Sequence, residues 1–338
     1  MRKMLIFSLV VGLVATPLLA GVVKKTKSDV AFKGFGRFTS VQTERLIMDR
    51  KWVDSQSDFK GKGLLGGLAG KFMRSGDSSE ITDLPALSIY KLNPKKKEYT
   101  VTPIRKISEE TKGEKAESGE EARGQEKTQS DIKITKSEFK VEDTGESSTI
   151  NNFPVRKYTV NWLTEWENVR TGEKGTNTLA TLVWATPLSD TFVKAREEEM
   201  KFSQEYFKAI GLNAGQVQQE ILGTNWFSML DTMNKAKGRP GQDFSQFGSE
   251  MKKIKGYPVI IDGKYFAVSQ NAKGEAGQEE EKSSKGILGG LAKKVLKKKP
   301  AGDEGKEPAL SYYIELVELS LAGLSANDFQ VPADYKKK

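Results

Sequence analysis

Three residue spacings in this sequence are typical of catalysis or cofactor binding. Residues 61–66 (GKGLLG) match the G-x-G-x-x-G pattern, which binds a dinucleotide when it connects a buried strand to a helix. The preceding residues, 53–60 (VDSQSDFK), are polar and charged. They do not form a buried strand, so the context does not favour a dinucleotide site.

Ser57–Lys60 and Ser137–Lys140 match the S-x-x-K pattern of serine acylases. That chemistry needs both side chains on one face of a helix, where residues i and i+3 are neighbours. Both pairs lie in strand-like or polar sequence, where i and i+3 point to opposite faces. We interpret both matches as chance. The acidic run Glu197–Glu199 is interpreted as a solvated helix face.

The composition restricts the possible chemistry further. The 338 residues include no His and no Cys, which removes the usual general base and the commonest zinc ligands. No acidic cluster has the alternating spacing of a calcium loop. The sequence therefore predicts a protein that is not an enzyme and has no cofactor and no metal site.

The first twenty residues have the order of a secretory signal. Arg2 and Lys3 precede an apolar run, 4–15, and a small residue, Ala20, ends the segment. We predict a signal peptide at 1–20 and a mature chain from Gly21; an uncleaved anchor is the alternative. No other segment approaches the apolar length of a membrane helix. The expected location is periplasmic or extracellular, soluble or peripheral. The formal net charge of +9 becomes +7 once Arg2 and Lys3 leave with the signal (52 − 45), and in an exported protein this favours anionic lipid or envelope polymer over nucleic acid.

Composition predicts one domain over 21–338 with three disordered or flexible insertions, at about 60–80, 105–131 and 270–308. Residues 105–131 contain a single large apolar residue, Ile107. Such a segment buries too little surface to offset the entropy of ordering.

Between the insertions, apolar residues alternate as in half-buried strands. Tyr158, Val160, Trp162 and Trp166 share one face of such a run. Further strands are expected at 179–185, at 309–321, and in two hairpins, 89–92 with 99–101 and 259–261 with 265–268. Asp262-Gly263 is the expected type I′ turn of the second hairpin. The chain is expected to close with an apolar segment that ends at Tyr335.

Helices are expected as one block in the middle of the chain. Ser189 or Asp190 can cap a helix that runs to about Ile210 and stops at Gly211. A second helix is predicted over 215–234 and a weaker one over 244–254. The order of strands, helices and more strands predicts an α+β fold with an antiparallel sheet.

Several phrases together resemble secreted bacterial proteins of the LolA-like, lipoprotein-carrier type. They are ALSIYKLNPKKKEYTV (86–101), NNFPVRKYTVNW (151–162), TLATLVWAT (178–186), KGYPVIIDGK (255–264) and LSANDFQVPADYK (324–336). The resemblance implies a curved antiparallel half-barrel with two or three helices across its open side and an apolar cavity. Relatives of that shape carry acyl chains or lipids, or sense misplaced lipoproteins. No catalytic residues carry over.

Aromatic residues are the candidates for a cavity wall. The chain has five tryptophans, and each suits either an apolar cavity or an ordinary core. The candidate ligand contacts are Tyr158, Trp162, Trp166, Trp184 and Trp226. Trp162 and Trp166 are the stronger candidates for the concave side because they share a strand face.

A nearly identical apolar segment occurs twice. Residues 62–72 read KGLLGGLAGKF and residues 285–295 read KGILGGLAKKV, with eight of eleven positions identical. Each can form a short helix with one apolar stripe, and lysines beside the second stripe suit an anionic lipid surface. The candidate contacts are Leu65, Leu68, Phe72, Leu288, Leu291, Val295, Lys293, Lys294, Lys297 and Lys298. The alternatives are packing on the protein's own surface and low-complexity drift.

Two functions follow as expectations. The first is a non-enzymatic periplasmic protein that binds or carries a lipid, acyl chain or lipoprotein and touches an anionic membrane through the repeated segments. The second is a structural or interaction module of the envelope with a filled core and no ligand. Neither involves nucleic acid.

Overall fold

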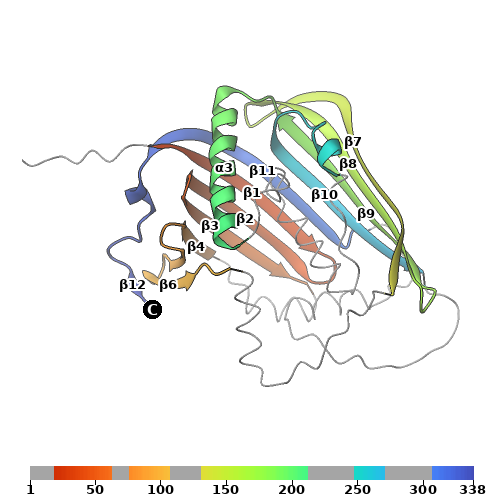
Figure 1. The fold of residues 1–338 in the computed structure, drawn as a ribbon, viewed down its shortest axis with the longest axis horizontal. Helices are drawn as coiled ribbons and strands as arrows, with labels where there is room; N and C mark the ends of the chain where they lie inside the picture. Colours follow the sequence, from red (N-terminus) through yellow and green to blue (C-terminus); the bar gives the residue numbers. More distant parts are fainter. Residues whose placement is uncertain (1–18, 63–75, 107–130, 212–246, 271–306) are drawn as a thin grey trace, which may run out of the picture.

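The computed structural model describes residues 19–62, 76–106, 131–211, 247–270 and 307–338. Within these ranges the chain forms one twelve-stranded sheet in the order β12-β6-β5-β4-β3-β2-β1-β11-β10-β9-β8-β7 (Figure 1). Neighbouring strands are antiparallel except β12 and β6, which are parallel. The strands are β1 (Leu19–Phe32), β2 (Gly36–Ile47), β3 (Arg50–Gly61), β4 (Gly76–Asp83), β5 (Ser88–Asn93), β6 (Glu98–Pro103), β7 (Ile132–Ile150), β8 (Phe153–Asn168), β9 (Lys174–Thr186), β10 (Tyr257–Gln270), β11 (Leu310–Leu324) and β12 (Lys336–Lys337).

Several sequence-based predictions are confirmed. The hairpin expected at 89–92 and 99–101 is β5 with β6, and the strands expected at 179–185 and 309–321 are β9 and β11. Along β8 the buried side chains alternate with more exposed ones, as the apolar pattern requires. The mature chain was expected to begin with strands, but the bounds of the first three were not predicted, because β2 and β3 carry polar residues on both faces.

The prediction of a hairpin turn at Asp262-Gly263 is wrong. Strand β10 runs through both residues without a break and pairs with β9 on one side and β11 on the other. The glycine has a packing role instead: a Cβ atom at Gly263 would lie 2.0 Å from Cζ of Tyr312. Glycine is favoured both in tight turns and where a large side chain packs against the backbone. The sequence alone therefore did not distinguish a turn at Gly263 from close packing.

One long helix, α3 (Asp190–Ala209), packs on one face of the sheet. It begins after Ser189 and ends before Gly211, whose φ of 80° suits glycine. Ala195 and Phe202 of α3 pack with Val22 of β1 and Leu46 of β2. We call the face that carries these residues the inner face and the opposite one the outer face.

Two other predicted helices have different outcomes. The helix expected over 244–254 is present only as α5 (Phe247–Met251), and its Met251 packs against inner-face residues of β7 to β11. The helix expected over 215–234 lies entirely outside the described residues. Of the described helices, none is long and apolar enough to cross a membrane.

The C-terminal segment covers part of the outer face. After β11 the chain forms a short 3₁₀ helix, η3 (Ala326–Phe329), and Phe329 packs with Ile47, Ile81 and Leu92. Val331 and Tyr335 add to the same cluster, which confirms the apolar closing segment. The sheet is therefore covered by α3 on the inner face and by the C-terminal segment on the outer face.

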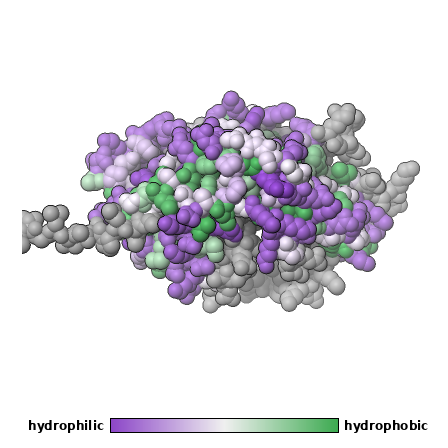
Figure 2. Space-filling view, turned by 90° about the horizontal axis from the view of Figure 1, so that it is seen from above, coloured by the Kyte–Doolittle hydropathy of each residue, from purple (hydrophilic) through white to green (hydrophobic). Residues whose placement is uncertain are grey.

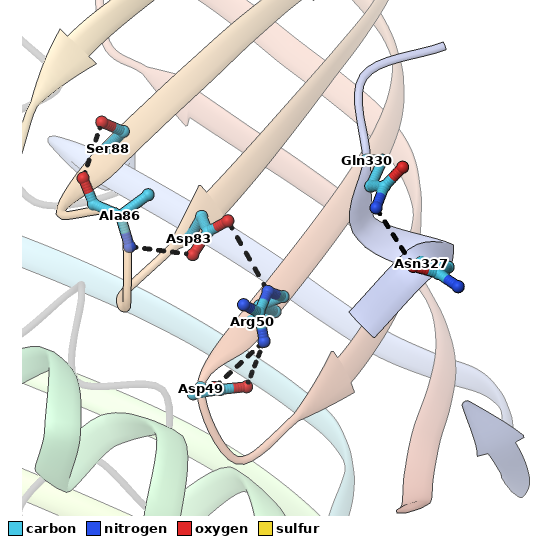
Figure 3. Close-up of polar contacts among 7 residues, drawn as sticks. All are labelled: Asp49, Arg50, Asp83, Ala86, Ser88, Asn327 and Gln330. Carbon is cyan, nitrogen blue, oxygen red and sulfur yellow. Dashed lines mark hydrogen bonds and ion pairs between the residues drawn. The ribbon is translucent and has the colours of Figure 1, made fainter. Parts of the chain in front are cut away.

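Polar contacts fix the turns next to this region (Figure 3). Arg50 at the start of β3 contacts Asp49 at 3.0 Å and Asp83 at the end of β4 at 3.6 Å. Asp83 also accepts a hydrogen bond from the backbone N–H of Ala86. One arginine thus connects the β2–β3 turn to the β4–β5 turn.

The outermost strand at the other side of the sheet, β7, is lined with charged side chains. Lys136 pairs with Glu138 along the strand. The backbone N–H of Val141 donates a hydrogen bond of 2.9 Å to the carboxylate of Glu250 in α5. The Glu250 side chain therefore accepts a hydrogen bond from a backbone N–H of the edge strand.

Candidate functional site

Aromatic side chains gather on the inner face of β8, β10 and β11. Side chains paired across neighbouring strands share a face, and one register row runs Trp162, Leu179, Tyr265, Leu310 and Phe32 from β8 to β1. Each of the first four is at most 5% exposed. We define the aromatic wall as Tyr158, Trp162, Trp166, Tyr265 and Tyr312.

Two glycines let these rings lie close against the sheet. A Cβ atom at Gly175 would lie 2.3 Å from the ring of Trp166, and Gly263 lies under the ring of Tyr312 in the same way. The hydroxyl of Tyr312 is 2.8 Å from that of Thr181 in a buried hydrogen bond. The rings of the wall therefore pack directly against the backbone at glycine positions, where a larger residue would overlap them.

A polar region continues the same face on β1, β2 and β3. The row that begins with Tyr158, Val183, Ile261 and Ile314 changes at β1 into Ser28, Ser40 and Ser57. The adjacent row carries Thr26, Gln42 and Ser55. We define the hydroxyl patch as Thr26, Ser28, Ser40, Gln42, Ser55 and Ser57.

The hydroxyl patch is uncharged and only partly satisfied. The hydroxyls of Ser28 and Ser40 are 2.8 Å apart and hydrogen-bonded, and Ser40 is buried. The side chains of Thr26, Gln42 and Ser55 are half-buried and make no side-chain hydrogen bond to any residue within the described ranges. As far as the described residues go, these groups can bond to something that enters the inner face.

An ion network lies beside the hydroxyl patch, where α3 meets the sheet. The Nζ atom of Lys24 is 2.6 Å from Glu199 of α3 and 3.3 Å from Glu44 of β2. The hydroxyl of Tyr257 donates to Glu199 at 2.8 Å. The neighbouring Lys51 places its Nζ atom 4.9 Å from the ring centre of Phe202. Both lysines nearest the patch are thus already in contact with partners.

Burial and charge act in opposite directions on this network. Burial disfavours the charged form of Lys24, but Glu44, Tyr257 and Glu199 outweigh it, so the pKa of Lys24 is raised well above its usual value. Burial also opposes ionisation of Glu44, yet Lys24 and Lys51 leave the pKa of that carboxyl lowered. Burial raises the pKa of the Tyr257 phenol. Lys24 and Glu44 therefore stay charged around neutral pH, and the phenol of Tyr257 stays neutral.

The structure brings together three of the five predicted cavity residues. Tyr158, Trp162 and Trp166 lie on the inner face of β8 and are buried. Trp184 pairs with Lys157, one position out of phase with Tyr158, so it lies on the outer face; the Nζ atom of Lys157 is 5.5 Å from its ring centre. The fifth residue, Trp226, lies outside the described residues.

The repeated segments lie outside the described residues as well. This holds for the predicted contacts of both copies: Leu65, Leu68, Phe72, Leu288, Leu291, Val295, Lys293, Lys294, Lys297 and Lys298. The hydroxyl patch was missed because its strands were not predicted. The signal was present: hydroxyl or amide side chains at every second position, at 26 and 28, 40 and 42, and 55 and 57.

The outer face carries an open depression of about 550 Å³ across the same strands. Its lining includes Lys27, Asp29, Gln56, Tyr313 and Glu315, and it also reaches Ser28, Ser40 and Ser57 of the hydroxyl patch. Burial, followed by the nearby charge of Glu315, raises the pKa of Tyr313 to about 12. Seen from above, hydrophobic surface gathers near the middle of the molecule between hydrophilic flanks (Figure 2). The two faces of the same strands thus differ in chemistry.

The candidate catalytic and metal-binding spacings are not brought together in the described residues. Among the described residues, no three His, Cys, Asp or Glu side chains form a group that could hold a metal ion. The Ser57–Lys60 and Ser137–Lys140 pairs lie within β3 and β7, where their side chains point to opposite faces.

Comparison with protein-family models found no match to this chain, and comparison with curated proteins found none either.

Proposed function

We propose that the protein is a non-enzymatic binding or carrier protein for a lipid, an acyl chain or the acyl part of a lipoprotein. The inner face is the binding surface, and the sheet is a curved half-barrel with helices across its open side, as in the LolA-like carriers that the sequence resembles. The packing of α3 and α5 against the inner face supports this arrangement.

The observation that carries the proposal is the apolar row across the inner face. Trp162, Leu179, Tyr265 and Leu310 lie side by side on four consecutive strands. Each methylene group that an alkyl chain buries on such a surface contributes about 0.8 kcal/mol. Because these four side chains are at most 5% exposed, an alkyl chain gains this free energy only where it replaces the groups that now cover them.

A second function is favoured by one observation. The members of the aromatic wall are already buried, and the Tyr312 hydroxyl is bonded to Thr181. A filled core of this kind suits an envelope module that binds a partner protein and holds no lipid. The two functions differ in whether an alkyl chain can occupy the inner face.

The decisive experiment is mass spectrometry of organic extracts of the purified, exported chain, followed by titration of the delipidated chain with laurate. We expect a co-purifying lipid and saturable binding of laurate, with a change in tryptophan fluorescence. An extract free of lipid together with no laurate binding would favour the filled-core module.

Export and membrane contact belong to the same proposal. Cleavage after Ala20 would remove only Leu19 and Ala20 from β1, the residues that pair with Leu324 and Gly323. N-terminal sequencing of exported protein should therefore begin at Gly21.

For the repeated segments, replacing Leu65, Leu68, Leu288 and Leu291 with Ser should abolish flotation with anionic liposomes. Unchanged flotation would instead favour their packing on the protein's own surface.

A further inference from the structure

The inner face is divided into an apolar part and an uncharged polar part, and the division falls between β11 and β1. On the β11 side, Ile314 continues the row that includes Tyr158, and on the β1 side the paired residue is Ser28. An alkane or a simple fatty acid has no group that uses the second part. A polar surface inside a lipid site costs affinity for an apolar ligand unless its groups are bonded.

From this division we infer that the ligand is an amphiphile with a neutral headgroup rich in hydroxyl groups, such as a glycolipid or a polyol lipid. The headgroup lies on the hydroxyl patch, and the alkyl chain extends from it onto the aromatic wall, where it replaces groups that now bury those rings. This inference rests on the proposed function and specifies its ligand.

The free hydrogen-bonding groups of the patch fit such a headgroup. Thr26 and Ser55 each offer a hydroxyl that can donate and accept, and Gln42 between them offers an amide with both capacities. These three are register neighbours across β1, β2 and β3. Sugars and polyols present the same mixture of donors and acceptors at closely spaced positions.

The charges around the patch do not fit an ionic headgroup. Lys24, in the next row of the inner face, already contacts Glu44 and Glu199. Lys51 is held over the ring of Phe202. A phosphate or carboxylate would have to displace an existing partner. The patch itself holds no carboxylate for a cationic headgroup, and Glu80 of β4 lies in the adjacent row. A neutral headgroup can bind without displacing an ionic partner and without needing a charge of opposite sign.

The test uses ligands that share a dodecyl chain and differ in headgroup. The delipidated mature chain is titrated by calorimetry with dodecyl maltoside, laurate, dodecyl sulfate and dodecyltrimethylammonium, each below its micelle concentration. We expect dodecyl maltoside to bind about tenfold or more tighter than the other three, a difference of about 1.4 kcal/mol.

Variants assign that preference to the patch. In Thr26→Val/Gln42→Leu/Ser55→Ala, dodecyl maltoside should lose about tenfold in affinity, because hydrogen bonds are removed, whereas laurate should bind as before or more tightly. If the triple variant does not fold, Gln42→Leu alone is used. The matched control is Gln56→Leu on the outer face of β3, which should change neither ligand.

The outcomes separate this inference from the proposed function. If none of the four ligands binds, the proposed function itself is wrong. If all four bind with similar affinity, the lipid site stands and the headgroup assignment is overturned. If only Gln56→Leu removes the maltoside preference, the sugar occupies the outer depression and the assignment is likewise overturned.

Discussion

The aromatic wall and the hydroxyl patch lie on one face of one sheet, yet they contribute to the molecule in different ways. The wall is buried, closely fitted and built around Gly175 and Gly263. The patch is mostly half-buried, and Thr26, Gln42 and Ser55 make no side-chain hydrogen bond within the part of the chain that the structure describes. The difference shows that backbone geometry sets where a site can be, whereas side-chain chemistry decides which part stabilises the fold and which part remains available for a ligand.

The largest effect should come from the wall. Trp162→Ala should lower the free energy of unfolding by about 3–5 kcal/mol, because a large buried side chain is lost and a cavity is left. Trp184→Ala, on the outer face, should cost about 1–2 kcal/mol, since that ring is only half-buried. Urea denaturation measures both. Equal losses would contradict the division between faces.

The ion network between the hydroxyl patch and α3 should give the next effect. Lys24→Met leaves Glu44 and Glu199 without their shared cation, which should cost about 2–3 kcal/mol because the three side chains are largely shielded from water. The control is Lys136→Met on the exposed edge strand, which should leave the urea midpoint unchanged.

The same network predicts a pH dependence. Because the pKa of Glu44 is lowered in the folded state, its contribution is complete above the ordinary carboxyl pKa of about 4.3 and is lost as pH falls through the lower folded value. Because the pKa of Lys24 is raised, its contribution is complete below about pH 10.4 and is lost at higher pH. Urea midpoints at pH 7 and pH 3 should therefore differ more in the wild type than in Lys24→Met.

The fit of the wall predicts a smaller effect. Gly263→Ala places a Cβ atom against the ring of Tyr312 and should cost about 1–3 kcal/mol through overpacking. In a Tyr312→Ala background the same substitution should cost clearly less, because the clashing ring is absent. Thermal unfolding of the four proteins measures this coupling. Additive losses would mean that Gly263 is needed for some other reason.

The smallest effect should come from the patch. Ser28→Ala or Ser40→Ala alone removes one partner of a hydrogen bond and should cost about 1 kcal/mol, whereas the double variant should be closer to neutral. Chemical denaturation of the single and double variants gives the coupling. A double variant that loses as much as Trp162→Ala would show that the patch is core, and the comparison with the wall would no longer hold.

The strongly patterned parts of the fold were predictable from the sequence. Tyr158, Trp162 and Trp166 were placed on one face by alternation alone, and α3 was located by its flanking Ser189 and Gly211. These signals are local, because they depend on spacing within one element.

The missed features depend on neighbours that the sequence does not identify. Trp184 was grouped with the other tryptophans because the sequence does not show its register with Lys157, and that register places it on the outer face. Gly263 was read as a turn because the ring that requires it, Tyr312, is distant in the chain. The hydroxyl patch forms only when β1, β2 and β3 are aligned, and polar strands give a weak hydrophobic pattern.

The guarded edge at β7 has a consequence for how the protein behaves in a crowded compartment. An open sheet offers its border strands as templates on which another chain can add a strand and begin a fibril. At this border, Glu250 occupies the N–H of Val141, and the flanking Lys and Glu side chains would have to be stripped of water before a new strand could align. The glutamate of α5 that bonds to Val141 therefore makes this position of the edge less available to an added strand.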